Sequence, residues 1–152
     1  MARGAHVKVL PPLLYVVPLA AAWLIESAAP TMLRLGPGQP FVGMALVACG
    51  VALMGWAVVT FRRRGTTVIP WEAVNALATD GPYRFTRNPI YLGDAVAYLG
   101  AALWLDSAWA LAALPVILVA TYRLVIRHEE SYLGATFAGA YAAYRRRVRR
   151  WI

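Results

Sequence analysis

The sequence has few of the residues on which soluble folds, disulfide frameworks and metal centres depend. Of its 152 residues, 14% are charged, seven are acidic, two are histidines and one is a cysteine, while 61% are hydrophobic. A soluble domain has about 25% charged residues, so an average globular enzyme and a disordered basic chain are both poor fits. The single Cys49 excludes a disulfide or a cysteine-based metal site within one chain. The composition therefore predicts an integral membrane protein.

The charge is strongly one-sided. Fifteen basic residues against seven acidic ones give a formal net charge of +8. Such a surplus suits an anionic partner, either a nucleic acid or a membrane surface. Because little polar surface accompanies it and no soluble DNA-binding pattern is present, we expect a membrane partner and no nucleic acid.

Four apolar stretches divide the chain: Val9–Ile25, Phe41–Phe61, Ile90–Leu105 and Ser107–Tyr122. As helices they are roughly 26, 32, 24 and 24 Å long, against a hydrocarbon core of about 30 Å. Asp106-Ser107 is typical of a turn with a helix N-cap, which predicts a tight hairpin between the last two stretches. The expected fold class is all-α, a polytopic membrane protein with about four transmembrane helices in a single domain, residues 1–152.

The basic residues predict the orientation. With the N-terminus inside, all of them except Arg34 fall on the cytoplasmic side. We therefore expect a protein of the inner (cytoplasmic) membrane, with both termini and the active site cytoplasmic. An alternative interpretation takes the first stretch as a signal peptide that ends at Ser27-Ala28-Ala29, although Pro30 directly afterwards argues against cleavage.

The densest run of polar and aromatic residues is DGPYRFTRNPIYLG, residues 80–93. Asn88-Pro89 is typical of a helix start, which aims free N–H groups at the preceding loop. Together with Arg84 and Arg87, this end suits an anionic group, and the tyrosines and Phe85 offer faces for a cation or an adenine-like ring. An interfacial anchor, with arginines on lipid head groups, fits the same residues.

Acidic residues are rare in the predicted cytoplasmic half. If the fourth helix continues, Glu129 and Glu130 follow it, with Arg127 one turn from Glu130 as an ion-pair partner. Carboxylates beside aromatic rings suit a ligand that carries an amino group or a positive centre. His128 has no second ligand at a suitable spacing, so we expect no metal site. Asp94 is either a functional acid inside the third stretch or a residue that pairs with a nearby arginine.

Two further segments are interpreted as surface helices. Apolar residues recur with spacings of 4, 3, 4 and 3 from Phe137 to Trp151, opposite five arginines, which predicts a cytoplasmic amphipathic C-terminal helix on the inner leaflet. It either anchors the protein or covers the site. The loop Arg62–Ala78, which includes Trp71, is interpreted as a short interfacial helix without an assigned role.

The motif Gly81-Pro82-Tyr83-Arg84-x-x-Arg87-Asn88-Pro89-x-Tyr91-x-Gly93, then Glu129-Glu130 and Phe137…Tyr141-x-x-Tyr144 with a basic end, resembles the isoprenylcysteine carboxyl methyltransferase family. That family is related to membrane phospholipid N-methyltransferases, and the sequence is similar to its small bacterial members. The resemblance covers residues 79–150, whereas residues 1–61, the two N-terminal transmembrane helices, carry no such signature. It implies a membrane enzyme that uses S-adenosylmethionine, releases S-adenosylhomocysteine and methylates a lipid or another lipophilic small molecule.

The resemblance also implies which residues form the site. The cofactor pocket would be lined by Gly81, Pro82, Tyr83, Asn88, Pro89, Tyr91, Leu92 and Glu129. Arg87 and Glu130 would lie near the acceptor and the transferred methyl group. Many members have histidine where Asn88 stands, and because asparagine cannot titrate, acid–base behaviour that depends on that histidine must differ here. A lipid amine, a quinone-like phenol, a hydrophobic thiol and a carboxylate all remain as acceptors.

Other classes of protein fit the sequence less well than a membrane methyltransferase. The sequence has no strand pattern and no glycine-rich turn after a strand, which excludes a soluble Rossmann methyltransferase. A non-catalytic membrane protein that binds lipid or a partner through its basic face is the main alternative. A transporter or channel needs a polar path through the bilayer, for which only Asp94 and Glu26 are available.

Overall fold

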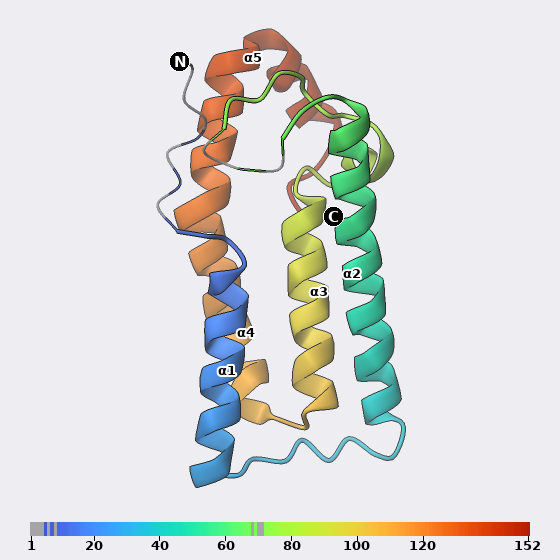
Figure 1. The fold of residues 1–152 in the computed structure, drawn as a ribbon, viewed down its shortest axis with the longest axis vertical. Helices are drawn as coiled ribbons and strands as arrows, with labels where there is room; N and C mark the ends of the chain where they lie inside the picture. The colour runs from blue at the N-terminus through green and yellow to red at the C-terminus, as the bar shows by residue number, and fades with distance from the viewer. Residues whose placement is uncertain (1–4, 6, 8, 68, 70–71) are drawn as a thin grey trace.

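The computed structural model describes residues 5, 7, 9–67, 69 and 72–152. Its helices are α1 (Leu13–Ala28), α2 (Gln39–Arg63), the 3₁₀ turn η1 (Gly81–Arg84), α3 (Pro89–Trp104), α4 (Ala108–Thr121), the π turn η2 (Tyr122–Ile126) and α5 (Arg127–Arg147). Four of them, α1 to α4, stand along the long axis of the molecule, and α5 continues α4 beyond the other helices (Figure 1). Within the described residues the only β pairing is an isolated bridge between Met32 and Ser107, so the all-α prediction is confirmed.

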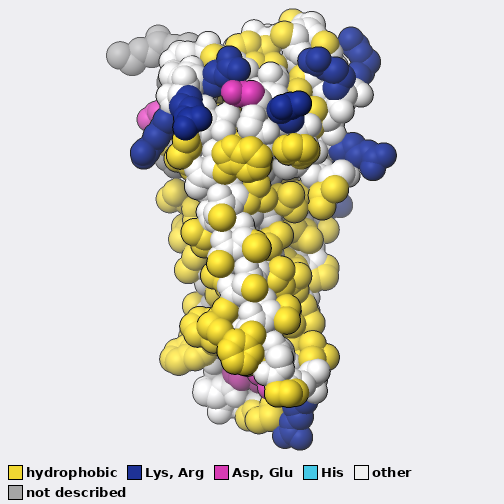
Figure 2. Space-filling view, turned by 90° about the vertical axis from the view of Figure 1, so that its right-hand side faces the viewer, with side chains coloured by type: hydrophobic (Ala, Val, Ile, Leu, Met, Phe, Trp, Pro, Cys, Tyr) yellow, Lys and Arg dark blue, Asp and Glu magenta, His cyan; other side chains and the backbone are white. Residues whose placement is uncertain are grey.

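Two helices are long and apolar enough to cross a membrane, judged by length and composition. They are α2 and the helical run Ala108–Arg147, which comprises α4, η2 and α5, while the apolar α1 is shorter. We call the part of the molecule formed by α1 to α4 the shaft. Large hydrophobic side chains such as Val51, Val116 and Val119 are exposed along it. Figure 2 shows hydrophobic side chains along the shaft, with most Lys and Arg side chains gathered at one end. We call this the basic end.

Glycines bring α2 and α3 into close contact. A Cβ atom added to Gly50 would lie 2.5 Å from the carbonyl oxygen of Gly93 and 2.7 Å from the backbone nitrogen of Ala97. Gly43 and Gly100 oppose each other in the same way further along. Small residues allow helix backbones to approach closely within a membrane. This contact fixes the position of α3, whose first turn carries the motif residues.

At the opposite end, the turn between α3 and α4 is tied to the loop between α1 and α2. Ser107 accepts a hydrogen bond of 3.3 Å from the backbone N–H of Ala110, which confirms the predicted N-cap. The carboxylate of Asp106 accepts hydrogen bonds from the backbone of Leu33 at 2.9 Å and from the Gln39 amide at 2.7 Å. These contacts hold the two connections together away from the basic end.

The predicted helix through Trp151 is wrong in its extent and its facing. α5 ends at Arg147 and Val148 is extended, with φ −121° and ψ 129°. Before that end, Ala138 breaks the helix with φ 36° and ψ −112°, so the last turns fold back toward the start of α3 (Figure 1). Tyr141 and Tyr144 are 2% and 3% exposed, which places them inside the protein rather than on the leaflet.

The predicted interfacial helix in the loop Arg62–Ala78 is also wrong for the described residues. α2 runs on to Arg63, and the residues described between 64 and 80 form no helix. Gly65 takes φ 63°, and the N–H of Thr66 donates back to the carbonyl of Phe61 at 3.1 Å, a glycine-dependent helix end. Trp71 lies outside the described residues.

Candidate functional site

A cavity at the basic end brings together segments that are far apart in the sequence. Its walls come from the end of α2, the described residues of the segment 67–78 (67, 69 and 72–78), the loop before α3, the first turn of α3, and α5. Thr67, Ile69, Val74 and Leu77 line one side, and the tyrosines 132, 141 and 144 line another. The cavity is therefore mainly apolar and aromatic, with a few charged groups set into it.

One of these charged groups is the Glu129 carboxylate. The Tyr91 hydroxyl donates a hydrogen bond of 2.7 Å to Glu129 Oε1, which joins the first turn of α3 to α5. Burial raises the pKa of Glu129 to about 7, and this residue lies beyond the apolar part of the helix that ends at Thr121. Among the described residues no cation pairs with Glu129. The cavity thus holds a carboxylate that a bound cation would stabilise.

The aromatic wall is held firmly. Tyr83 stacks on Phe61 with ring centroids 4.8 Å apart and an interplanar angle of 14°. The Tyr144 hydroxyl donates to the Tyr83 carbonyl at 2.7 Å, and burial raises the pKa of both phenols. Both tyrosines are therefore neutral at physiological pH.

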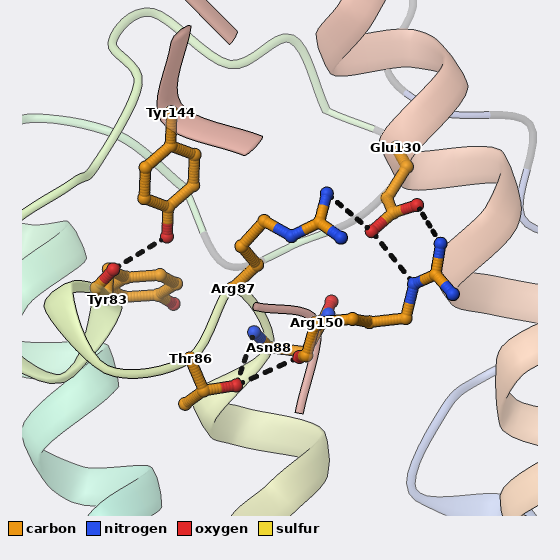
Figure 3. A network of polar contacts seen from close by, with 7 residues as sticks. All are labelled: Tyr83, Thr86, Arg87, Asn88, Glu130, Tyr144 and Arg150. Carbon is orange, nitrogen blue, oxygen red and sulfur yellow. Dashed lines mark hydrogen bonds and ion pairs between the residues drawn. The ribbon is translucent and has the colours of Figure 1, made fainter. Parts of the chain in front are cut away.

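A second charged group is a carboxylate between two arginines (Figure 3). Arg150 binds Glu130 through two contacts, Nε to Oε1 at 3.1 Å and Nη2 to Oε2 at 2.9 Å. Arg87 Nη1 lies 3.1 Å from Glu130 Oε1, and the Arg87 and Glu130 side chains are 9% and 12% exposed. The predicted pair between Arg127 and Glu130 is wrong, because Glu130 faces these two arginines and Arg127 is exposed.

The Arg87 guanidinium is incompletely satisfied. Its Nε atom is buried and forms no hydrogen bond with any described residue, while its Nη1 atom is engaged in the ion pair with Glu130. Two arginines around one carboxylate also leave a surplus positive charge in this group. Buried donors without partners are uncommon in folded proteins, so this side chain has capacity for an anionic or polar ligand.

Residues 148–150, which we call the strap, are hydrogen-bonded to the loop that carries the sequence motif before α3. We call this loop, residues 80–88, the motif loop. The Thr86 hydroxyl and the Asn88 amide both donate to the Arg150 carbonyl, at 2.9 and 3.0 Å, and the Arg87 N–H donates to the Arg149 carbonyl at 3.0 Å. Asn88 occupies the predicted N-cap position of α3, but its side chain makes no capping bond because it binds the strap instead. The non-helical backbone of residues 148–150 thus replaces the helical turn that the sequence pattern predicts.

Most of the residues implied by the resemblance meet at the cavity. Seven line it: Tyr83, Arg87, Asn88, Pro89, Tyr91, Glu129 and Glu130. Pro82 is fully buried, and Leu92 instead faces a side groove between α3 and α4. Gly81 has φ 54° and packs on α2, where an added Cβ would lie 2.6 Å from Thr60 Oγ1. Across the described part of the chain, no three His, Cys, Asp or Glu side chains are grouped closely enough to hold a metal ion.

Several lining residues were not identified from the sequence. Tyr141 and Tyr144 belong to the tail pattern, which was interpreted as an amphipathic helix on the inner leaflet that either anchors the protein or covers the site. Tyr132 accepts a hydrogen bond of 3.2 Å from the Val74 N–H and so holds the segment 67–78 in place. That segment has no periodic pattern, and no signal in the sequence shows that it covers a cavity.

The arginine-paired carboxylate is expected to stabilise the fold. Replacing Glu130 with alanine leaves Arg87 and Arg150 without their partner, which we expect to cost about 2 kcal/mol. This is below the cost for a fully buried pair because Arg150 is 32% exposed. Asp80→Ala, which breaks the exposed pair between Arg64 and Asp80, serves as the control and is expected to cost less than about 1 kcal/mol. Denaturant unfolding in detergent measures both, and equal losses would contradict the assignment.

Comparison with known proteins identifies the family. Residues 39–140, more than half of the chain, match the phospholipid methyltransferase family. The protein belongs to this family, and the predicted resemblance is confirmed. The match starts with α2, before the motif region 79–150 from which the resemblance was drawn.

Individual relatives agree with this placement. A probable protein-S-isoprenylcysteine O-methyltransferase of Oryza sativa subsp. indica is 31% identical over 110 residues, which cover 71% of this chain and 58% of the rice protein. Its counterpart in subsp. japonica gives the same values. The cobalt-zinc-cadmium resistance protein CzcN of Cupriavidus metallidurans is 34% identical over 74 residues, 49% of this chain and 34% of that protein. The matched region thus spans little more than half the length of the rice relatives.

Proposed function

We propose that this protein is an integral membrane methyltransferase that takes its methyl group from S-adenosylmethionine and delivers it to a lipophilic acceptor. The observation that carries this proposal is the cavity at the basic end. It combines aromatic walls with the carboxylate of Glu129, which lacks a described cationic partner, and with the unpaired Nε of Arg87. Membership of the phospholipid methyltransferase family supports the reaction class.

The residues present fit this cofactor. Glu129 and the faces of Tyr83 and Tyr91 suit its α-amino group and its sulfonium. The unpaired Nε of Arg87 suits its carboxylate. Phe61, Leu77 and Leu133 line the cavity and offer apolar surface for the adenosine. Gly81 and Pro82 act less directly, by holding the motif loop against α2.

When bound, the cofactor supplies a methyl group on a sulfonium sulfur, which passes in line to the acceptor without a covalent enzyme intermediate. The protein's task is therefore to align the two partners and to exclude water. The described residues 67, 69 and 72–78 and the tyrosines of α5 line the cavity and would keep water from the reacting atoms. Arg87 and Glu130, at the boundary with the strap, would orient the polar end of the acceptor.

The proposal includes a membrane arrangement. All four helices α1 to α4 would cross the bilayer, with α3 and α4 as a short hairpin and the basic end in the cytoplasm. The concentration of arginines at that end and the apolar shaft support this arrangement. The acceptor would approach from the bilayer, and residues 1–152 would act as a single domain.

Binding of the cofactor is expected to depend on pH through Glu129. Because the pKa of Glu129 is about 7, its carboxyl is largely protonated at pH 6 and ionised at pH 8. A ligand cation beside it is held only by the ionised form, so the affinity for S-adenosylhomocysteine is expected to rise about tenfold per unit below that pKa and to level off above it. Titrations at pH 6, 7 and 8 measure this dependence. Glu129→Gln is expected to remove it, and a wild-type affinity that falls with rising pH would contradict the role.

The test of the proposed function is a calorimetric titration of the purified protein with S-adenosylhomocysteine. The expected result is saturable binding of one molecule per chain. 5′-Methylthioadenosine, which lacks the amino acid part, is the matched ligand and is expected to bind more weakly. If folded protein binds neither compound, the methyltransferase proposal is overturned.

A further inference from the structure

The last segment of the chain covers the cavity with one side and carries arginines on the other. After the break at Ala138, Tyr141 and Tyr144 enter the cavity wall and are almost completely buried. The neighbouring arginines 145, 146, 147 and 149 are exposed. We call residues 138–150 the closing segment.

The polar contacts of the closing segment are made by Tyr144, which donates to the Tyr83 carbonyl, and by residues 149 and 150 at its end. Figure 3 shows its end bound through Arg150 to Glu130 and through the Arg150 carbonyl to Thr86 and Asn88. Arg150 also lies over the Tyr122 ring, with its guanidinium carbon 4.7 Å from the ring centroid. Between these contacts and the break at Ala138, the residues Gly139, Ala140, Ala142 and Arg145 to Arg147 are exposed.

The charge around the closing segment is strongly positive. Besides its own four exposed arginines, the basic end exposes Arg62, Arg63, Arg84, Arg123 and Arg127. The acids described at this end are Glu72, Asp80, Glu129 and Glu130; Asp80 already pairs with Arg64, and Glu130 pairs with Arg87 and Arg150. A positively charged surface with so few acidic residues of its own attracts anions from outside the protein.

The motif loop and the nearby part of α2 carry exposed aromatic side chains of the kind found at a membrane interface. Phe85, in the motif loop, is 69% exposed, and Trp56 beside it is 48% exposed, with ring centroids 6.4 Å apart. Exposed aromatic rings of this kind lie at the level of lipid head groups. In Figure 2 the Lys and Arg side chains lie directly beyond the apolar shaft. Phospholipid head groups are therefore within reach of the arginines.

We infer that anionic phospholipid head groups bind Arg145, Arg146, Arg147 and Arg149 and thereby hold the closing segment over the cavity. The arginines on the outer side and the tyrosines on the inner side belong to the same short segment. Lipid that holds the arginines therefore also holds the tyrosines in the cavity wall. The negative charge of the leaflet then sets how firmly the cavity is closed. The consequence for cofactor affinity rests on the proposed function, whereas the lipid contact does not.

The experiment compares the protein in nanodiscs of phosphatidylcholine alone with discs of equal parts phosphatidylcholine and phosphatidylglycerol. Hydrogen exchange of residues 138–150, measured without cofactor, is expected to be about fivefold slower in the anionic discs. The dissociation constant for S-adenosylhomocysteine is expected to fall by a similar factor. About 1 M salt, which shortens the screening length to about 3 Å, is expected to remove both effects.

A matched pair of variants separates the closing segment from charge in general. Arg145→Gln/Arg146→Gln/Arg147→Gln is expected to lose the response to phosphatidylglycerol, while Arg62→Gln/Arg63→Gln/Arg123→Gln, with the same charge, is expected to keep it. Equal exchange in the two kinds of disc, or equal loss in both variants, overturns the inference. Slower exchange without S-adenosylhomocysteine binding in either disc sustains the lipid contact and overturns the proposed function alone.

Discussion

Replacing Glu129 with glutamine is expected to lower the affinity for S-adenosylhomocysteine by roughly 10- to 150-fold, the equivalent of about 1.5–3 kcal/mol for a hydrogen bond to a charged group. The change removes the negative charge but keeps an oxygen that accepts the 2.7 Å hydrogen bond from Tyr91. Packing between α3 and α5 is therefore preserved. Titration calorimetry at pH 8, where the wild-type carboxyl is ionised, measures the loss.

The control for this variant is Glu72→Gln, which removes an exposed carboxylate from the same end of the molecule. It is expected to bind as the wild type does. Equal affinity in the wild type and Glu129→Gln, with both proteins folded, would show that Glu129 does not hold the ligand cation. The cofactor site would then have to lie elsewhere.

Replacing Gly50 with leucine is expected to destabilise the protein by about 3 kcal/mol or more. The first side-chain carbon alone would lie 2.5 Å from the Gly93 carbonyl oxygen and 2.8 Å from the Ala97 Cβ, and neither the backbone nor a helical Cβ can move aside. α2 and α3 must then separate, which also displaces the motif loop between them. Thermal unfolding in detergent measures the loss of stability, and binding of S-adenosylhomocysteine reports on the site.

Gly55→Leu provides the matched control on the same helix. Nothing lies within 4 Å of a Cβ atom at Gly55, which is exposed, so the added side chain meets open space. This variant is expected to be as stable as the wild type or slightly more so, because glycine weakens a helix by about 1 kcal/mol. Similar unfolding temperatures for the two leucine variants would contradict the close contact between α2 and α3.

The helical part of the structure could be predicted because it depends on local pattern. The second apolar stretch, Phe41–Phe61, became α2 with two residues added at each end, Gln39–Arg63. Asn88-Pro89 marked the start of α3, and Ser107 marked the start of α4. In each case the composition of one segment, or one residue pair with a restricted backbone, is sufficient to determine the element.

The course of the tail could not be predicted from its own pattern. Spacings of 4 and 3 up to Trp151 favour a helix, but the backbone of residues 149 and 150 finds hydrogen-bond donors in Thr86, Arg87 and Asn88. These residues are distant in the sequence, so local propensity gives no warning of the competition. The pairing of Glu130 with Arg87 and Arg150, in place of Arg127, has the same origin.

The sequence did not predict that Leu77, Ala78 and the residues before them line the cavity, for a different reason. Leu77 and Ala78 pack in one apolar cluster with Tyr83, Tyr141 and Tyr144. The segment before them has no helical or strand period, and its position depends on burial against other elements. The resemblance identified Tyr83, Tyr91 and Glu129 at the cavity because it draws on motifs that reflect tertiary contacts rather than local structure.

The measurement that tests the central claim most directly follows a labelled methyl group. S-adenosylmethionine labelled in its methyl group is added to membranes that contain the wild-type protein, and the lipid fraction is then extracted and counted. We expect label in that fraction that depends on the protein and falls sharply with Glu129→Gln. Absence of label in the extracted lipids of membranes that supply varied amines, phenols, thiols and carboxylates, with folded protein that binds S-adenosylhomocysteine, would contradict methyl transfer to a lipophilic acceptor.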